Sequence, residues 1–179
     1  MANINDLQDL FFKHGFTDFR WLNPQEIVVG QWVRMKCLFG CGEYGHNACC
    51  PPNAPPVEEC ARFFREYQKA AVFHFEKTVA KPEARHAWTR KVDLALLKLE
   101  REVFLSGFHK AFLIFMDSCH ICDTCTGKRD TCKEPKQARP TADAMAMDVY
   151  ATVRKLGYPI EVLSNTKQTM NRYAFLFIE

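Results

Sequence analysis

The spacing of four cysteines is the feature that most restricts how this chain can fold. Cys119, Cys122 and Cys125 stand at successive intervals of three, Cys132 follows seven residues later, and Pro135 lies three residues beyond it. Two residues between cysteines let the backbone curl, so that successive sulfurs approach one centre while N–H groups point toward them. We therefore expect residues 119–140 to form a loop wrapped around a metal.

This spacing is typical of thiolates that bind a [4Fe-4S] cluster, because a cubane takes ligands at several iron corners from one short piece of chain. Zinc is the alternative metal, although a single zinc ion is usually bound by two well-separated Cys-x2-Cys pairs. Six residues separate Cys125 from Cys132, more than in bacterial ferredoxins, whose fourth cysteine serves another cluster. We assign all four cysteines to one site.

A second cysteine-rich stretch covers residues 37–52 and predicts a second metal site. Cys37, Cys41 and one of the adjacent pair Cys49 and Cys50 make a set of three thiolates. The fourth position would be filled by the remaining cysteine, by His46 or by a substrate. A position left open to a substrate is what distinguishes catalytic from structural metal sites. A closed structural site with four protein ligands stays the alternative.

Composition excludes several classes of protein. The chain has 179 residues, enough for one domain with a substantial core, and no apolar run long enough to span a bilayer. Its first residues lack the pattern of a signal peptide, so we expect a cytoplasmic protein. Nine cysteines, an odd number in a reducing compartment, favour metal ligation over disulfides. A net charge of +3 gives no support to nucleic acid binding.

Hydrophobic periodicity predicts alternating helices and strands. Helices are expected over residues 4–14, 55–69, 83–106 and 141–156. Strands are expected over residues 16–22, 26–35, 70–75, 110–116, 158–163 and 173–178. The first two strands would form a hairpin, and residues 110–116 a central strand that leads into the 119–140 loop. The fold class is therefore α/β: a single domain, residues 1–179, with a mixed sheet flanked by helices and two cysteine-rich metal-binding loops.

The two stretches together resemble a known family. The residues that carry the resemblance are Arg34-x-Lys36-Cys37-x3-Cys41-x2-Tyr44-Gly45, Cys50-Pro51-Pro52, Cys119-x2-Cys122-x2-Cys125-x6-Cys132-x2-Pro135-x3-Arg139-Pro140 and Met147-Asp148-Val149. This pattern is similar to that of a widespread microbial family described only as predicted metal-binding proteins of unknown function. The resemblance implies that Cys50 is the ligand and Cys49 an addition of this chain, and it supplies no reaction.

Three functions fit these residues. The first is electron transfer to a redox partner protein by one or two [4Fe-4S] clusters, with Lys133 and Arg139 close to the cofactor and able to raise its potential. The second is an enzyme whose Cys37, Cys41 and Cys50 cluster has an open iron, a Lewis acid toward a small or sulfur-containing substrate. The third is a zinc-stapled interaction module. The sequence assigns no catalytic residue and no oligomeric state.

Overall fold

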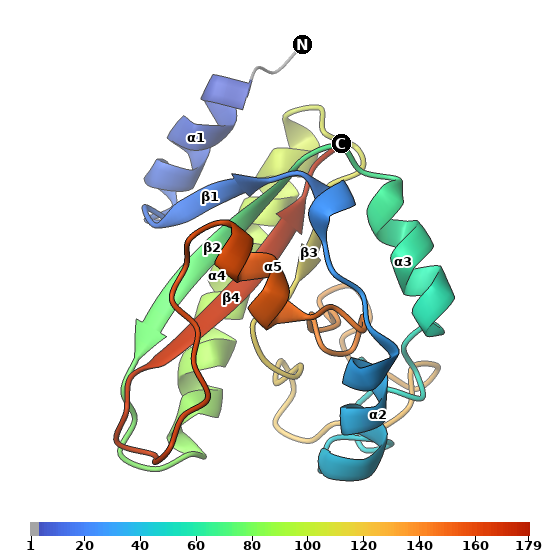
Figure 1. Ribbon diagram of the computed structural model, residues 1–179. Coiled ribbons are helices and arrows are strands. Elements are labelled where there is room, and N and C mark those ends of the chain that lie inside the picture. Colours follow the sequence, from blue (N-terminus) through green and yellow to red (C-terminus); the bar gives the residue numbers. More distant parts are fainter. Residues whose placement is uncertain (1–3) are drawn as a thin grey trace.

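The computed structural model describes residues 4–179, and its centre is a four-stranded antiparallel sheet (Figure 1). The strands are β1 (Phe19–Leu22), β2 (Ala70–Lys77), β3 (Phe112–Ile114) and β4 (Met170–Phe177), in the order β1-β2-β4-β3. The longest pairing joins β2 to β4 from Ala70 opposite Phe177 to Lys77 opposite Met170. The α/β single domain is confirmed, but the sheet is antiparallel, where a mixed sheet was expected.

Helices cover both faces of the sheet, so each central strand is apolar on both sides. Helices α1 (Ile4–Lys13) and α4 (Ala84–Leu105) pack on one face against the side chains of Ala71, Phe73, Ala174 and Leu176. Helices α3 (Val57–Arg65) and α5 (Val149–Lys155) pack on the other face against Ala70, Val72, Phe175 and Phe177. The alternation has the period of two that a strand imposes, which explains the continuous apolar runs of β2 and β4.

Four elements confirm the expectations from periodicity: α1, β2, α4 and β4. Helix α3 is also present, but it begins at Val57 and ends at Arg65, inside the expected range. No helix of the described chain has the length and apolar character of a membrane span. The expectation that the chain lacks a signal peptide rests partly on residues 1–3, which lie outside the described residues.

The expected hairpin at the N-terminal end was wrong. Asn23 caps a short 3-10 helix, η1 (Pro24–Glu26), by accepting a hydrogen bond from the Gln25 N–H. Residues 31–40 then form helix α2 (Gln31–Gly40) instead of a strand. Strand β1 pairs with β2, 48 to 54 residues away along the chain. The β-branched residues of 27–33 suggested a strand, but they meet no neighbouring strand apart from one bridge between Val29 and Met147.

Three further elements differ from expectation near the C-terminal half. Strand β3 lies at the sheet edge, not its centre, and is shielded by the chain at Pro140 and Thr141, which bonds to Phe115 in a parallel bridge. The helix expected over residues 141–156 is shorter than predicted. Thr141 caps only a turn, because Ala146 takes a positive φ of 55°. Helix α5 begins at Val149, with Asp148 as its cap. Residues 158–163 form no strand.

Candidate metal centre

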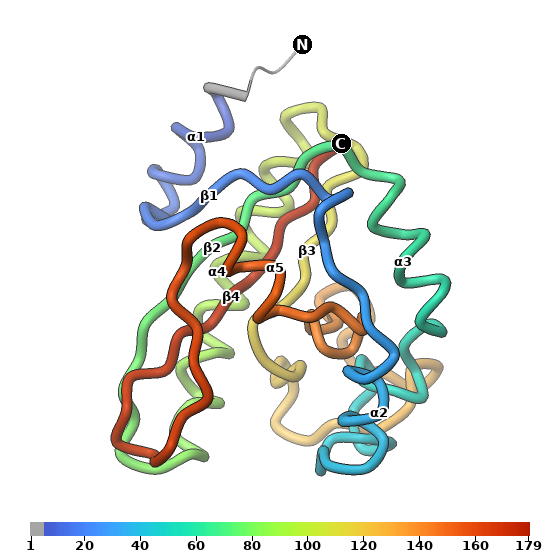
Figure 2. Tube along the Cα trace, viewed as in Figure 1, coloured from blue at the N-terminus to red at the C-terminus, as the bar shows by residue number. Residues whose placement is uncertain are grey.

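The cysteines outside the core lie in two groups at one end of the molecule. Figure 2 shows the segment that contains residues 37–53 meeting the segment that follows β3 beside α2. The first thiol group comprises Cys37, Cys41 and Cys50, and the second comprises Cys49, Cys119, Cys122, Cys125 and Cys132. All nine cysteines of the chain carry free thiols. Cys60, the ninth, is fully buried in α3, as a core residue.

Helix α2 and the turn after it position the first thiol group. Cys37 lies in the last turn of the helix and Cys41 directly follows its end. Both sulfurs line a cavity of about 130 Å³ together with Cys50, which the chain returns to the same place. Burial, and then the negative charge of Asp143, raises the pKa of Cys37. Burial, followed by Glu43 and Cys41, raises the pKa of Cys50 to about 12. A bound cation would favour the thiolate forms of Cys37 and Cys50, because its positive charge compensates the neighbouring negative charges that raise their pKa.

The second thiol group lies on the loop that β3 leads into. The Cys49 thiol contributes most to lowering the pKa of Cys119, and the backbone N–H groups of Ile121 and Arg139 lower it further. The Cys125 sulfur accepts another from the Ala48 N–H at 3.3 Å. Hydrogen bonds from backbone N–H groups to thiolate sulfurs are typical of cysteine-bound metals. These contacts favour the thiolate form of Cys119, whereas burial raises the pKa of Cys122 in the same loop.

The two cysteine stretches are tied together by asparagine side chains. Asn47 donates to the carbonyl of Cys119 at 3.0 Å, and Asn53 donates to the carbonyl of Gly127 at 2.9 Å. Gly127 has a φ of 74°, and a Cβ there would lie 3.4 Å from the carbonyl oxygen of Gly45. A glycine is required at this position because the backbones of the two stretches approach closely and the conformation is left-handed. The two thiol groups thus belong to one structural unit.

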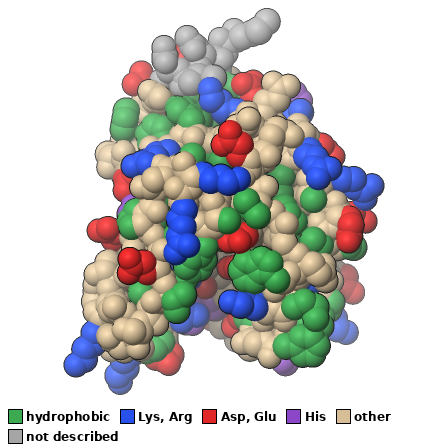
Figure 3. Space-filling model, viewed as in Figure 1, with side chains coloured by type: hydrophobic (Ala, Val, Ile, Leu, Met, Phe, Trp, Pro, Cys, Tyr) green, Lys and Arg blue, Asp and Glu red, His purple; other side chains and the backbone are tan. Residues whose placement is uncertain are grey.

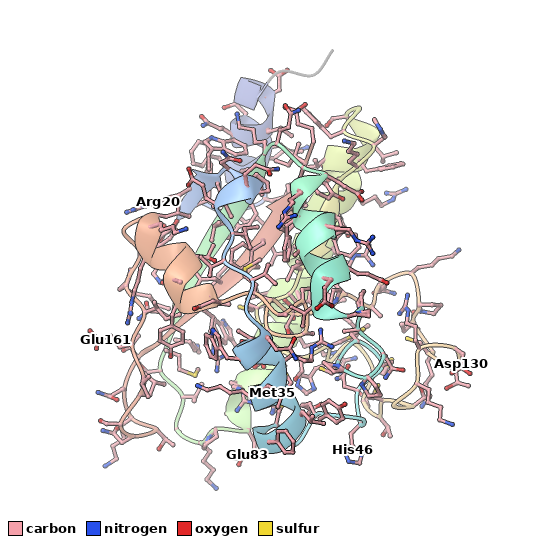
Figure 4. All side chains as sticks on the ribbon, turned by 45° about the vertical axis from the view of Figure 1, so that its right-hand side comes forward. Arg20, Met35, His46, Glu83, Asp130 and Glu161 are labelled. Atoms are coloured by element: carbon pink, nitrogen blue, oxygen red, sulfur yellow. The ribbon has the colours of Figure 1, made fainter. Side chains whose placement is uncertain are left out.

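Cys49 and Cys50 face different groups, although they are neighbours in sequence. The Cys49 thiol contacts Cys119, and Cys50 lines the cavity with Cys37 and Cys41. The sequence left Cys49 and His46 as possible fourth ligands of the first site, and neither lines that cavity. His46 is exposed, and Figure 4 shows it at the outer end of its loop. Only three cysteines line the first site, whereas the second site has five.

The two basic residues expected near the cofactor have specific partners. The Arg139 guanidinium forms a double hydrogen bond with Glu100 of α4, at 3.0 and 2.7 Å. Arg139 reaches the second thiol group through its backbone N–H, which donates to Cys119. Lys133 donates to the carbonyl of Thr124 at 3.3 Å, within the same loop. Both side chains therefore fix the loop that carries the cysteines.

Sequence reasoning missed several charged groups beside the thiols. The first site is flanked by Arg85, whose Nε lies 2.9 Å from the Asp117 carboxylate, and by Arg172 of β4. Asp93 of α4 is buried with one carboxylate oxygen unpaired, and burial, then Asp117 and Cys119, raises its pKa to about 8. Its position between Thr89 and Leu96 on the buried stripe of α4 was the available signal, since a carboxyl seldom occupies such a stripe.

The donor set can be compared with what each metal requires. Within residues 4–179, no group of three or more His, Cys, Asp or Glu side chains is arranged to hold a metal ion. Sulfurs at about 2.3 Å from one tetrahedral zinc would lie only about 3.8 Å apart. A cubane places each cysteine on a different iron and needs a wider set of soft thiolates. Thiolates bind both zinc and iron–sulfur clusters, so the donor chemistry of the two thiol groups is compatible with either.

Comparison with known families agrees with this chemistry at a coarser level. Residues 20–178 match the model of a family described as "Predicted metal-binding protein (DUF2284)". The chain belongs to this family, which is a family of predicted metal-binding proteins of unknown function. No curated protein matches the chain. No solved structure matches it either.

Proposed function

We propose that this protein is an iron–sulfur protein that binds a [4Fe-4S] cluster at each thiol group and exchanges electrons with a partner protein. The observation that carries the proposal is the second thiol group: the Cys125 sulfur accepts a hydrogen bond from the Ala48 N–H, and the Cys49 thiol and the backbone N–H groups of Ile121 and Arg139 lower the pKa of Cys119. Such bonds stabilise thiolates and raise the potential of a cluster that they hold. When bound, a cluster supplies one-electron redox chemistry.

The surface of the second group supports electron exchange with an acidic partner. Cys125 is exposed, so a cluster bound there would lie close to the surface. Four basic side chains of the same loop are also exposed: Lys128, Arg129, Lys133 and Lys136. Because a cubane with four thiolates is anionic, these cations would offset its charge and attract carboxylates of a partner.

A second candidate function, an enzyme, is favoured by the first thiol group. Three cysteines line its cavity, and the remaining lining includes the polar or charged residues Glu43, Tyr44 and Ser118. A site with three protein thiolates leaves one metal position for a small molecule, which is the arrangement of catalytic sites. Both candidate functions use an iron–sulfur cluster. In the first the cluster exchanges electrons with a partner protein, and in the second a small molecule binds the metal.

Cysteine substitution tests the proposal. Cys122→Ala should lose about four irons and four acid-labile sulfides per chain, because one cubane loses a ligand. Cys60→Ala is the matched control, since Cys60 is buried in the core beside Pro55 and belongs to neither thiol group. Iron and sulfide analysis of anaerobically purified protein provides the measurement. An unchanged iron content in Cys122→Ala would overturn the assignment, and zinc without sulfide in both variants would replace it with a zinc module.

A further inference from the structure

The cavity of the first thiol group adjoins a second cavity, and we call the two together the cleft. The inner cavity has a volume of about 130 Å³ and the outer one about 200 Å³. Both are lined by Met116, Thr141, Asp143 and Arg172, so these four residues form a shared wall. Figure 3 shows the molecule notched at its lower edge, between the loop that carries Glu161 and the side of α2. The cleft therefore extends from the apolar side chains of α5 and the loop after it to Cys37, Cys41 and Cys50.

The lining of the cleft changes along its length. The outer cavity has an apolar wall made by side chains of α5, the following loop and β4: Val149, Ile160, Val162, Leu163 and Met170. Val162 is 83% exposed and Leu163 is 40% exposed, so part of this wall is uncovered. The inner cavity holds the three thiols and most of the charged groups. A ligand that fits this profile has a polar end near the thiols and an apolar end at the mouth.

Arg172 is the cation positioned to bind the polar end. The other arginine of the cleft, Arg85, is paired with Asp117. Among the described residues, no carboxylate lies within ion-pair distance of Arg172, whose recorded contact is a weak one to the Met170 sulfur at 3.9 Å. Its positive charge favours the ionised form of Asp143, a side chain exposed at the surface. Arg172 lines both cavities of the cleft, and its guanidinium keeps hydrogen-bonding capacity for an anion.

We propose that the cleft binds a small aliphatic monocarboxylate, with its carboxylate on Arg172 and its alkyl chain along Val162 and Leu163. A carboxylate matches the planar fork of arginine, and the apolar wall would remove a short chain from water. Glu161 at the outer end and Asp143 at the shared wall disfavour a second negative charge on the ligand. A role of the cleft as a substrate site rests on the proposed enzyme function. Binding of the carboxylate alone depends only on Arg172 and the apolar side chains of the cleft.

Calorimetric titration with acetate, butyrate and hexanoate tests the proposal on anaerobically purified protein of known iron content. Hexanoate should bind at least about tenfold more tightly than acetate, because each buried methylene adds affinity. Arg172→Met should weaken hexanoate binding at least about tenfold. It should leave binding of the neutral hexanamide unchanged. Arg101→Met is the matched control, because Arg101 is exposed on α4 and lines neither cavity of the cleft.

The outcomes separate this proposal from the proposed function. Equal affinity of wild-type protein and Arg172→Met for hexanoate, or no dependence on chain length, would overturn the carboxylate site even if the protein holds both clusters. Chain-length-dependent binding that Arg172→Met abolishes would support the site even in a protein without iron. Val162→Asp, a change at an exposed position, should weaken hexanoate more than acetate and tests the apolar wall without altering the core.

Discussion

Cys49 is the cysteine whose role the structure changes most. No sequence pattern connects Cys49 with Cys119, because the two lie seventy positions apart in the chain. The spacing of Cys119, Cys122 and Cys125 is local and could be recognised directly. Contacts across the fold, such as the one between the Cys49 and Cys119 thiols, depend on how the two stretches pack together. The proximity of Cys119, Cys122, Cys125 and Cys132 could therefore be predicted from their spacing, whereas that of Cys49 could not.

Replacing Cys49 should alter the potential of the second site without removing its metal. The thiol contact with Cys119, followed by burial, raises the pKa of Cys49, so its S–H remains a donor to the Cys119 sulfur. Cys49→Ala removes that donor and should shift the midpoint potential to a more negative value at unchanged iron content. Cys49→Ser keeps a donor and should shift it less. Redox titration with optical detection measures this, and loss of iron in Cys49→Ala would instead make Cys49 a ligand.

Asp93 should make stability depend on pH. Its pKa is raised from 3.8 to about 8, first by burial, so the folded state favours the protonated carboxyl. The contribution of protonated Asp93 to the free energy of unfolding is complete below the pKa that Asp93 has in the unfolded state. It is lost as the pH rises toward 8, by at most about 1.4 kcal/mol per pH unit. Asp93→Asn removes this dependence, so the variant should gain stability relative to wild type as the pH rises.

Urea unfolding at pH 5.5 and pH 8 measures the effect of Asp93→Asn. Over that interval, the stability of the variant relative to wild type should rise by about 1 to 3 kcal/mol. Asp130→Asn, at an exposed loop position, is the control and should change stability by less than about 0.5 kcal/mol. A relative stability of Asp93→Asn that is the same at both pH values would contradict the burial of an ionisable group.

At the scale of elements, strong periodicity was informative and weak periodicity was misleading. Helix α4 has long apolar repeats, and β2 and β4 are short apolar runs covered on both faces, so their types followed from sequence. Residues 31–40 carry few buried side chains, with Val33 the one fully covered, and their helix could not be recognised from an apolar stripe. The edge position of β3 also escaped prediction, because the chain at Pro140 and Thr141 shields it as a neighbouring strand would.

The connection between the two cysteine stretches should depend on Asn53. Its side chain donates to the carbonyls of Asn47 and Gly127, at 3.1 and 2.9 Å, and accepts from the Arg129 N–H at 3.3 Å. Asn53→Ala should cost about 1 to 3 kcal/mol of unfolding free energy. It should also speed the loss of iron to a chelator, because the loop of the second site is freed.

Asn165→Ala is the matched control for Asn53, since Asn165 lies in the exposed loop before β4 and bonds only within that loop. Chelator-induced bleaching of the visible absorption measures iron loss in both variants. Equal rates for wild type and Asn53→Ala would show that the two stretches hold their metals independently. A faster rate in Asn53→Ala alone supports a single structural unit.

In the whole molecule, the packed sheet forms the core, and the loops that carry the cysteines extend from one end of it. Helices on both faces bury the sheet, while α2 and the loop after β3 bring eight of the nine cysteines together at one end. Cys49 and Cys50 join the two thiol groups through consecutive residues, whose Cα atoms are about 3.8 Å apart. Two clusters held there would be close neighbours, which suits electron exchange between them.

The most direct measurement is the content of iron, zinc and acid-labile sulfide per chain in protein purified without oxygen. Two clusters predict about eight irons and eight sulfides, with visible absorption that dithionite bleaches. About four of each would support the second site and leave the first without a cluster. Zinc in place of iron, with no sulfide and no visible absorption, would contradict the account.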